Sequence, residues 1–299
     1  MRLSVWHETR YVHQQQVDSS KHLAHLTPLS RSTQQVIEHT LTIDPEPEIS
    51  GSFEDAFGNH VLSWEFQQAH AHLSVIAHSQ VSTQSLTPAH TDLTCAQAQS
   101  HLHYRSQQPV GLETVFVHPS PHVPRHEAFA LYAQADFEPQ RPVVEAAHAW
   151  MQRMHSDLTY DHQSTQVDTP AWMALQARRG VCQDFAHIML GGFRAMGLAA
   201  CYVSGYVLTQ AAPGQARMLG ADASHAWVAL WVPGLSDHPS AGWLHLDPTN
   251  HRSGWGSPGE DYIIVACGRD FADVSPLRGV LHGGDVAPPQ VRVTLECET

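Results

Sequence analysis

One cysteine, Cys182, lies in a setting that suits a nucleophile. It follows Gly180 and opens a stretch in which apolar residues recur every three to four positions, from Phe185 to Met196. This spacing predicts a helix that packs on a core by one face, and Gly197 is typical of its end. A thiol in the first turn of a helix lies near unpaired backbone N–H groups and the positive end of the helix dipole, which favour the thiolate. The alternative is a buried structural cysteine, a common environment for a free thiol.

A histidine and an aspartate lie on two predicted strands downstream of this cysteine. Residues 224–232 and 242–247 both have the composition of strands, and the segment between them has that of a loop. A hairpin folded about Ser236 would pair His225 with Asp247. We therefore expect these two side chains to lie side by side.

These residue types together suit thiol-based acyl transfer. Such a reaction needs a nucleophile, a base that takes and returns its proton, and a carboxylate that orients the base. Taken singly, His225 could be an ordinary residue at a strand end, and Asp247 could be a turn residue before Pro248. Taken with Cys182, they favour a catalytic triad.

The N-terminal part of the chain has the pattern of a β domain. Residues 1–85 contain short β-rich runs separated by turn signals, at 3–9, 34–43, 61–66 and 73–77. Their regular spacing predicts a β-sandwich. Residues 86–140 are more polar and contain scattered prolines, so we expect a connector there, with one short helix near Glu127 to Ala135.

Residues 141–299 are predicted to form the catalytic domain. A core-facing helix is expected after Pro142, and a second helix begins with Thr169 and Pro170 and runs to Arg179. The cysteine helix follows, and then three strand-like runs, at 201–209, 225–232 and 242–247. Helices followed by strands predict an α+β domain with helices packed on a mostly antiparallel sheet.

Composition narrows the possible partners. The chain has 16 Lys and Arg against 29 Asp and Glu, a formal charge of −13, which argues against a nucleic-acid or anionic-membrane partner. Its first residues lack the apolar run of a signal peptide, and no stretch is long enough to cross a bilayer, so we expect a cytoplasmic protein. The five scattered cysteines fit free thiols in a reducing compartment.

The 24 histidines do not by themselves indicate a metal site. Local pairs occur, such as His70 with His72 and His101 with His103, but a metal site needs ligands that converge and outer partners that hold them. We predict neither a bound metal nor another cofactor.

Three stretches resemble the signature blocks of the transglutaminase-like superfamily. They are Gly-Val-Cys-Gln-Asp-Phe-Ala at 180–186, Ser-His-Ala-Trp at 224–227 and Leu-Asp-Pro-Thr-Asn at 246–250. Residues 197–206 also match, except at Ala200 and Cys201, where relatives usually show a proline and an arginine nearby. Asp-Ala-Phe-Gly-Asn at 55–59 resembles the bacterial transglutaminase-like N-terminal domain, so the resemblance covers nearly the whole chain.

The resemblance implies a papain-like α+β core and a role for each residue of the triad. Cys182 would be the nucleophile, His225 the general base and acid, and Asp247 the group that orients the imidazole. Superfamily members include protein crosslinkers, cysteine peptidases, deglycosylating amidases and inactive scaffolds. We expect a peptidase or amidase acting on a peptide or protein through a thioester. Transamidation and a non-catalytic binding module are the alternatives, and the oligomeric state stays open.

Two further expectations follow from the resemblance. Animal crosslinkers depend on calcium, but this chain has no acidic loop of the required spacing, so calcium is not predicted. The backbone N–H of Cys182 can donate to an oxyanion, and in the superfamily a second donor lies upstream of the cysteine. Tyr160 and Trp172 are candidates; Trp172 belongs to a predicted helix and should pack in the core, so we predict Tyr160.

Overall fold

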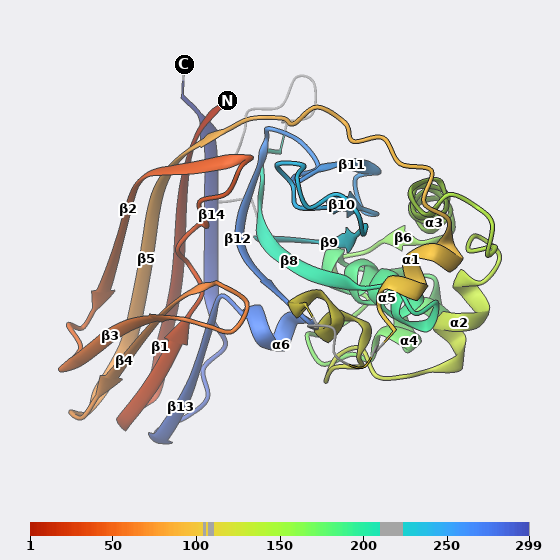
Figure 1. Cartoon of the computed structure of the whole chain (residues 1–299). Coiled ribbons are helices and arrows are strands. Elements are labelled where there is room, and N and C mark those ends of the chain that lie inside the picture. The colour runs from red at the N-terminus through yellow and green to blue at the C-terminus, as the bar shows by residue number, and fades with distance from the viewer. Residues whose placement is uncertain (104–105, 107–110, 210–223, 299) are drawn as a thin grey trace, which may run out of the picture.

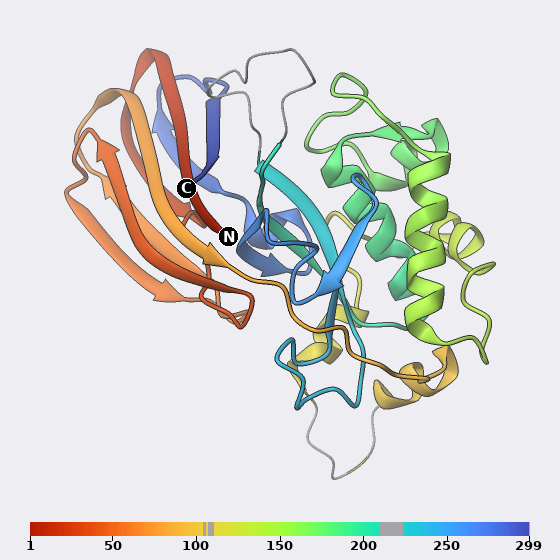
Figure 2. The same ribbon diagram turned by 90° about the horizontal axis from the view of Figure 1, so that it is seen from above.

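A computed structural model describes residues 1–103, 106, 111–209 and 224–298. The chain forms two antiparallel sheets and a layer of helices (Figure 1). Seen from above, the second sheet lies between the curled N-terminal sheet and the helices (Figure 2). The predicted α+β class is therefore confirmed.

The N-terminal strands belong to one sheet with the order β2-β5-β1-β4-β3. Their bounds are Arg2–Ala24 for β1, Gln34–Asp44 for β2, Ile49–Glu54 for β3, His60–Phe66 for β4 and His70–Thr83 for β5. The sheet curls so that β2 and β5 face β4 across a core that includes Trp64, Phe66 and Val75. The predicted strands are all present, but they form one sheet that curls over its own core, whereas a β-sandwich would have two separate sheets. β3 escaped prediction because every residue of it is exposed, which leaves no alternating apolar pattern.

The C-terminal segment returns to this first sheet. Strands β13 (Leu277–Gly283) and β14 (Gln290–Cys297) both pair with β1. The last two strands of the expected domain, residues 141–299, therefore belong to the N-terminal sheet. The reason lies in β1, whose 23 residues are long enough to pair with β5 and β14 along one half and with β4 and β13 along the other.

The predicted connector is part of the folded core. It contains α1 (Cys95–His101), the short helix η1 (Leu112–Val117) and α2 (Glu127–Ala133), the last at the predicted position. Cys95 and Phe129 are almost completely buried in the helical core that packs on the second sheet, and Phe116 packs on the other face of that sheet. The sequence did not predict this burial, because single apolar residues separated by prolines and polar residues form no periodic pattern.

The second sheet carries the strands of the candidate site. Its order is β11-β10-β9-β8-β12, and the bounds are Ala200–Val207 for β8, Ser224–Trp231 for β9, Trp243–Asp247 for β10, Arg252–Trp255 for β11 and Tyr262–Gly268 for β12. Helices lie against one face: α3 (Val143–Asp157), α4 (Ala171–Ala177) and α5 (Cys182–Ala195). The short strands β6 (Thr159–Tyr160) and β7 (Arg179–Gly180) pair in parallel, and α6 (Phe271–Val274) follows β12.

Helix α5 is held tightly because two of its residues have no side chain. A methyl group at Gly191 would lie 2.6 Å from the ring of Phe129, and one at Gly192 would lie 2.5 Å from the ring of Trp150. Helices α2 and α3 can therefore approach α5 closely, and the predicted apolar stripe of α5 is buried. This packing fixes the helix whose first residue is Cys182.

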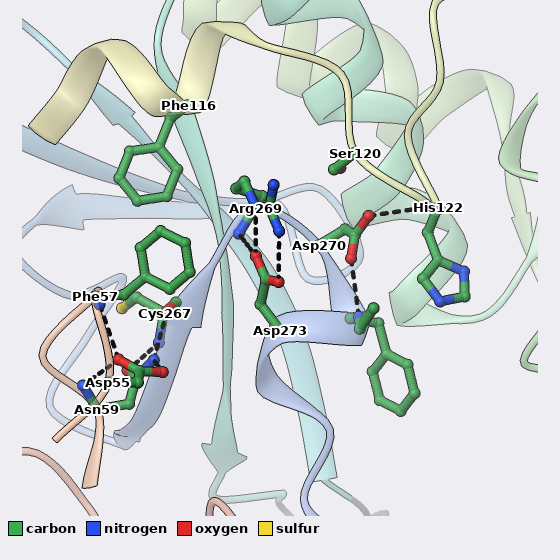
Figure 3. A network of polar contacts seen from close by, with 12 residues as sticks. Asp55, Phe57, Asn59, Phe116, Ser120, His122, Cys267, Arg269, Asp270 and Asp273 are labelled. Atoms are coloured by element: carbon green, nitrogen blue, oxygen red, sulfur yellow. Dashed lines mark hydrogen bonds and ion pairs between the residues drawn. The ribbon is translucent and has the colours of Figure 1, made fainter. Parts of the chain in front are cut away.

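Side-chain amides of the N-terminal region cover the edge strand β12. The amide of Gln34 donates to the carbonyl of Ile264 (2.7 Å) and accepts from its N–H (2.8 Å). Asn59 makes the same two bonds with Cys267, both 2.8 Å long (Figure 3). Asp55 accepts from the backbone N–H and the side-chain amide of Asn59 and so orients it. The motif at residues 55–59 thus attaches the N-terminal region to the second sheet.

Candidate active site

The sequence around Cys182 builds a capped helix start. Asp184 is 2% exposed, and its Oδ2 accepts from the backbone N–H of Val181 (2.8 Å) and the hydroxyl of Thr165 (2.6 Å). A methyl group at Gly180 would lie 2.6 Å from the Cβ of Asp184, so only glycine leaves room for the capping residue. Cys182 is half-buried at the first position of α5. The spacing of glycine, cysteine and aspartate therefore places a half-buried thiol at a rigid helix N-terminus.

His225 and Asp247 lie together, although not in the predicted register. In the hairpin of β9 and β10, Val228 pairs with Leu246, so the two strands are offset by two residues from a direct pairing of His225 with Asp247. A shift of two keeps every side chain on its face, and diagonal neighbours stay within reach. His225 Nε2 is 2.7 Å from Asp247 Oδ2. The loop ends with two residues of positive φ, Ala241 and Gly242, which loop composition did not locate.

The Asp247 carboxylate is fully buried and surrounded by donors. Its Oδ2 also accepts from the hydroxyl of Tyr262 (2.7 Å) and the side-chain amide of Asn250 (2.8 Å). Its Oδ1 accepts from the backbone N–H groups of Thr249 (2.9 Å) and Asn250 (3.2 Å). Burial alone would raise the pKa of Asp247, but His225 and these donors lower it below its ordinary value. The carboxylate is therefore ionised at neutral pH.

The ionised carboxylate changes the proton affinity of His225. Burial would lower the pKa of this histidine, but the hydrogen bond to Asp247 and its charge, followed by those of Cys182, raise it to about 10. Because Nε2 contacts Asp247, the Nδ1 side of the ring is left for the thiol. At neutral pH an imidazolium therefore lies between Cys182 and Asp247.

Tyr160 lies beside the cysteine turn. It pairs with Gly180 in the short parallel sheet, and its ring centroid is 6.3 Å from that of Phe185 in α5. Burial and then the charges of Cys182 and Asp247 raise the pKa of Tyr160 to about 12, so its hydroxyl keeps its proton. Within the described parts of the chain this hydroxyl has no hydrogen-bond acceptor. The structure thus brings Tyr160 close to Cys182 and Asp247.

The alternative donor, Trp172, packs elsewhere. Its ring stacks on His126, with centroids 5.0 Å apart and planes 2° from parallel. It also packs against the helical core, as expected for a residue of that helix.

Three residues of the site were missed by sequence reasoning. Tyr262 and Asn250 hold Asp247, and Trp227 stacks on His225 at a centroid distance of 5.9 Å. Asn250 and Trp227 stand inside the recognised blocks, so only their roles were missed. Tyr262 lies on β12, a strand that was not predicted, and nothing local in the sequence connects it with Asp247.

Neither a metal cluster nor a membrane-spanning helix is found in the described residues. There, no three His, Cys, Asp or Glu side chains gather in an arrangement that could hold a metal ion. In the same residues, no helix combines the length and the apolar character needed to cross a bilayer.

Comparison with known proteins places the site inside a recognised family region. Residues 132–248 match the transglutaminase-like superfamily, and residues 3–82 match the bacterial transglutaminase-like N-terminal region. An uncharacterized protein of Mycobacterium tuberculosis (strain H37Rv) is 37% identical over 289 residues, which cover 94% of this chain and 88% of the relative. An uncharacterized protein of Mycobacterium leprae is 33% identical over 285 residues, 94% of each chain.

A solved structure shares the fold over the full length. It is the crystal structure of a candidate cysteine protease from Cytophaga hutchinsonii, with a TM-score of 0.72 and 19% sequence identity. The similarity covers 100% of this chain and 92% of that one. The curled N-terminal sheet and the helix-covered second sheet therefore occur together in another protein.

Proposed function

Since the chain belongs to the transglutaminase-like superfamily, we propose that it is a cysteine-dependent enzyme that hydrolyses an amide bond of a peptide or protein. The observation that carries this proposal is the position of His225. Its Nε2 is 2.7 Å from the buried Asp247 carboxylate, and Cys182 contributes to its raised pKa from the other side. A thiol, an imidazolium and a carboxylate in a row can perform acyl transfer without a cofactor.

In the proposed first step, the Cys182 thiolate attacks the carbonyl carbon of the amide. The carbonyl oxygen becomes an oxyanion, which accepts from the backbone N–H of Cys182 and the hydroxyl of Tyr160. The imidazolium of His225 then gives its proton to the amide nitrogen, the C–N bond breaks, and an amine leaves. The product is a thioester on Cys182.

In the second step, neutral His225 takes a proton from water as the water oxygen attacks the thioester. Collapse of the second tetrahedral intermediate releases a carboxylic acid and restores the thiolate and imidazolium. Asp247 holds the ring so that Nδ1 faces the sulfur throughout. A primary amine in place of water would give transamidation by the same route, and exclusion of water from the site decides between the two.

Mass spectrometry of a peptide library tests the proposal. Peptides that contain glutamine and internal amides are incubated with the protein, with and without a primary amine, and Cys182→Ala serves as the control. Hydrolysis or deamidation that is lost in the control supports the proposal, whereas amine incorporation would replace hydrolysis by transamidation. Absence of any product, together with failure of a thiol probe to label Cys182 in the folded protein, would identify a non-catalytic binding module.

A further inference from the structure

A second group of thiols lies on the sheet face opposite α5. Cys201 on β8 and Cys267 on β12 line a pocket of about 150 Å³ together with Arg31 and His245. The other walls are Phe57, Leu112, Glu113, Phe116, Ala229 and Trp243. Figure 3 shows Phe57 and Phe116 close to Cys267. The proposed reaction of Cys182 uses none of these residues.

The two thiols are neighbours across adjacent antiparallel strands. Cys267 pairs with Val203, and Cys201 lies two residues further along β8 on the same face. Their sulfurs are close enough to affect each other's ionisation. Cys201 lowers the pKa of Cys267, whereas burial and then Cys267 raise that of Cys201. One sulfur of the pair is thus the better thiolate and the other is the proton-bearing thiol.

Charged groups around the pair favour a thiolate on Cys267. The Arg31 guanidinium donates toward its sulfur, with Nη2 3.8 Å from Sγ. Asp55 opposes ionisation of Cys267, and Arg31 and Arg194 favour that of Cys201. Glu113 also lines the pocket. The closest charged contact of the Cys267 sulfur is therefore a cation that keeps its proton at every physiological pH.

His245 supplies a hydrogen-bond donor to the pocket. It is 5% exposed, and its Nδ1 accepts from the indole N–H of Trp227 (2.9 Å). Burial and the charge of Arg31 lower the pKa of His245 to about 3, so the ring is neutral and its proton is on Nε2. In the described residues no acceptor contacts this N–H. A molecule in the pocket would therefore meet an unpaired donor close to the Cys267 sulfur.

We propose that Cys267 is a second reactive thiol, which a small hydroperoxide oxidises and Cys201 then converts to a disulfide. The Cys267 thiolate attacks the terminal oxygen of the hydroperoxide, an S–O bond forms and the O–O bond breaks. The leaving alkoxide or hydroxide is stabilised by Arg31 and the Nε2–H of His245 and takes a proton from water. The Cys201 sulfur then attacks Cys267, an S–S bond forms, and hydroxide leaves with the Cys201 proton as water.

The electrons and the space both allow this reaction. Two thiols lose two electrons in total, and one hydroperoxide gains them to become an alcohol or water together with the water of the second step. A volume of about 150 Å³ corresponds to roughly five water molecules, which is enough for hydrogen peroxide or a short alkyl hydroperoxide. His245 in this pocket has its pKa lowered to about 3, so at neutral pH it carries no extra proton to give to a leaving amine, as His225 would.

Peptide mapping of the oxidised protein tests the proposal independently of the proposed function. The Cys182→Ala protein is treated with stoichiometric hydrogen peroxide, alkylated, digested and analysed by mass spectrometry. We expect a disulfide between Cys201 and Cys267. It should form about tenfold faster than Cys297 is oxidised, because Cys297, although exposed, has no cationic partner in the described residues. Cys95, fully buried, should stay reduced. In Cys201→Ser, dimedone should trap a sulfenic acid on Cys267.

Variants of Arg31 test whether its charge, and not only the accessibility of Cys267, determines the rate of oxidation. Arg31 is exposed, so its substitution should leave the fold intact, which circular dichroism checks. Arg31→Met should slow oxidation of Cys267 several-fold and move its rate profile to higher pH, while Arg31→Lys should retain most of the rate. Oxidation of Cys267 no faster than that of Cys297, or an unchanged rate in Arg31→Met, would overturn the proposal.

Discussion

Two histidines on one face of the five-stranded sheet have pKa values that are shifted in opposite directions. His225 and His245 are both almost completely buried, on the neighbouring strands β9 and β10. The pKa of His225 is raised to about 10, whereas that of His245 is lowered to about 3. The difference is the partner: His225 contacts the Asp247 carboxylate, while His245 accepts from Trp227 and lies near Arg31. At equal burial, the charge of the neighbour decides the protonation state.

The two thiol sites differ in the same way. Cys182 has a cation, His225, that can give up its proton and take it back. Cys267 has a cation, Arg31, that cannot. A thiolate beside a proton carrier suits acyl transfer, and a thiolate beside a fixed charge suits oxidation. In our proposals, neighbouring side chains therefore set the chemistry of both sulfurs.

Removal of either thiol should give the largest contrast. Cys182→Ala should lower amide hydrolysis by at least about four orders of magnitude, because the nucleophile is lost. Cys267→Ser should leave kcat unchanged, since Cys267 takes no part in the proposed hydrolysis. Steady-state kinetics with a peptide amide measures both. A large loss in Cys267→Ser with an intact fold would mean that the two sites are coupled.

Asp247→Asn should make His225 resemble His245. In this variant an NH2 group stands where Oδ2 of the aspartate accepts from His225, Tyr262 and Asn250. An NH2 group cannot accept these bonds and has no negative charge, so the imidazolium is no longer stabilised. We expect kcat to fall by about three to four orders of magnitude, and the pKa of His225 to fall toward that of a buried neutral ring. Kinetics and NMR titration of the imidazole check the two effects. An unfolded variant with full activity in its folded fraction would reassign Asp247 to a structural turn.

Tyr160→Phe should have a smaller effect, confined to the first site. If the hydroxyl donates only to the oxyanion, kcat should drop by roughly two orders of magnitude with little change in KM. Oxidation of Cys267 by hydrogen peroxide should proceed at the same rate in this variant. Unchanged kcat, or a defect that lies wholly in KM, would remove Tyr160 from the site.

The dependence of stability on pH should have opposite signs at the two sites. The folded pKa of His225 is above its ordinary value of 6.5, so its stabilising effect is complete below pH 6.5 and is lost as pH rises toward 10. The excess unfolding free energy of wild type over His225→Gln should therefore fall by about 2 kcal/mol between pH 7.5 and pH 9. For Cys267 the folded pKa is lowered. The unfolding free energy of wild type minus that of Cys267→Ser should therefore rise with pH over the same range. Urea unfolding at several pH values measures both differences, and slopes of equal sign would contradict the comparison.

The sequence predicted the parts of the site that depend on local pattern. The stripe after Cys182 located α5, and two-residue alternation placed His225 and Asp247 on one face of neighbouring strands. The offset of two residues in the hairpin changed neither face, so the pairing of the two side chains survived an incorrect register. Local rules were sufficient because these residues lie close together in the chain.

Contacts between distant segments could not be predicted in this way. Tyr262 reaches Asp247 from β12, and Gln34 and Asn59 bind the backbone of the same strand from the N-terminal region. The pocket around Cys267 combines seven separate segments, among them Arg31 and η1. Nothing in the spacing of these residues shows that they meet, because their contacts arise only when the two sheets pack together.

The pairing of β1 with β14 has a consequence for biosynthesis. Leu3 lies opposite Cys297 and Val5 opposite Leu295, so β1 is completed by a strand that is synthesised only after the whole segment between them. At roughly 5–20 residues per second, β1 waits on the order of tens of seconds for this partner. During that time one long edge of β1 is open to pairing with other chains. The helical core around α5 is synthesised in the interval, so we expect it to fold before the N-terminal sheet is complete, and nascent chains stalled before Gln290 to be the species most dependent on chaperones.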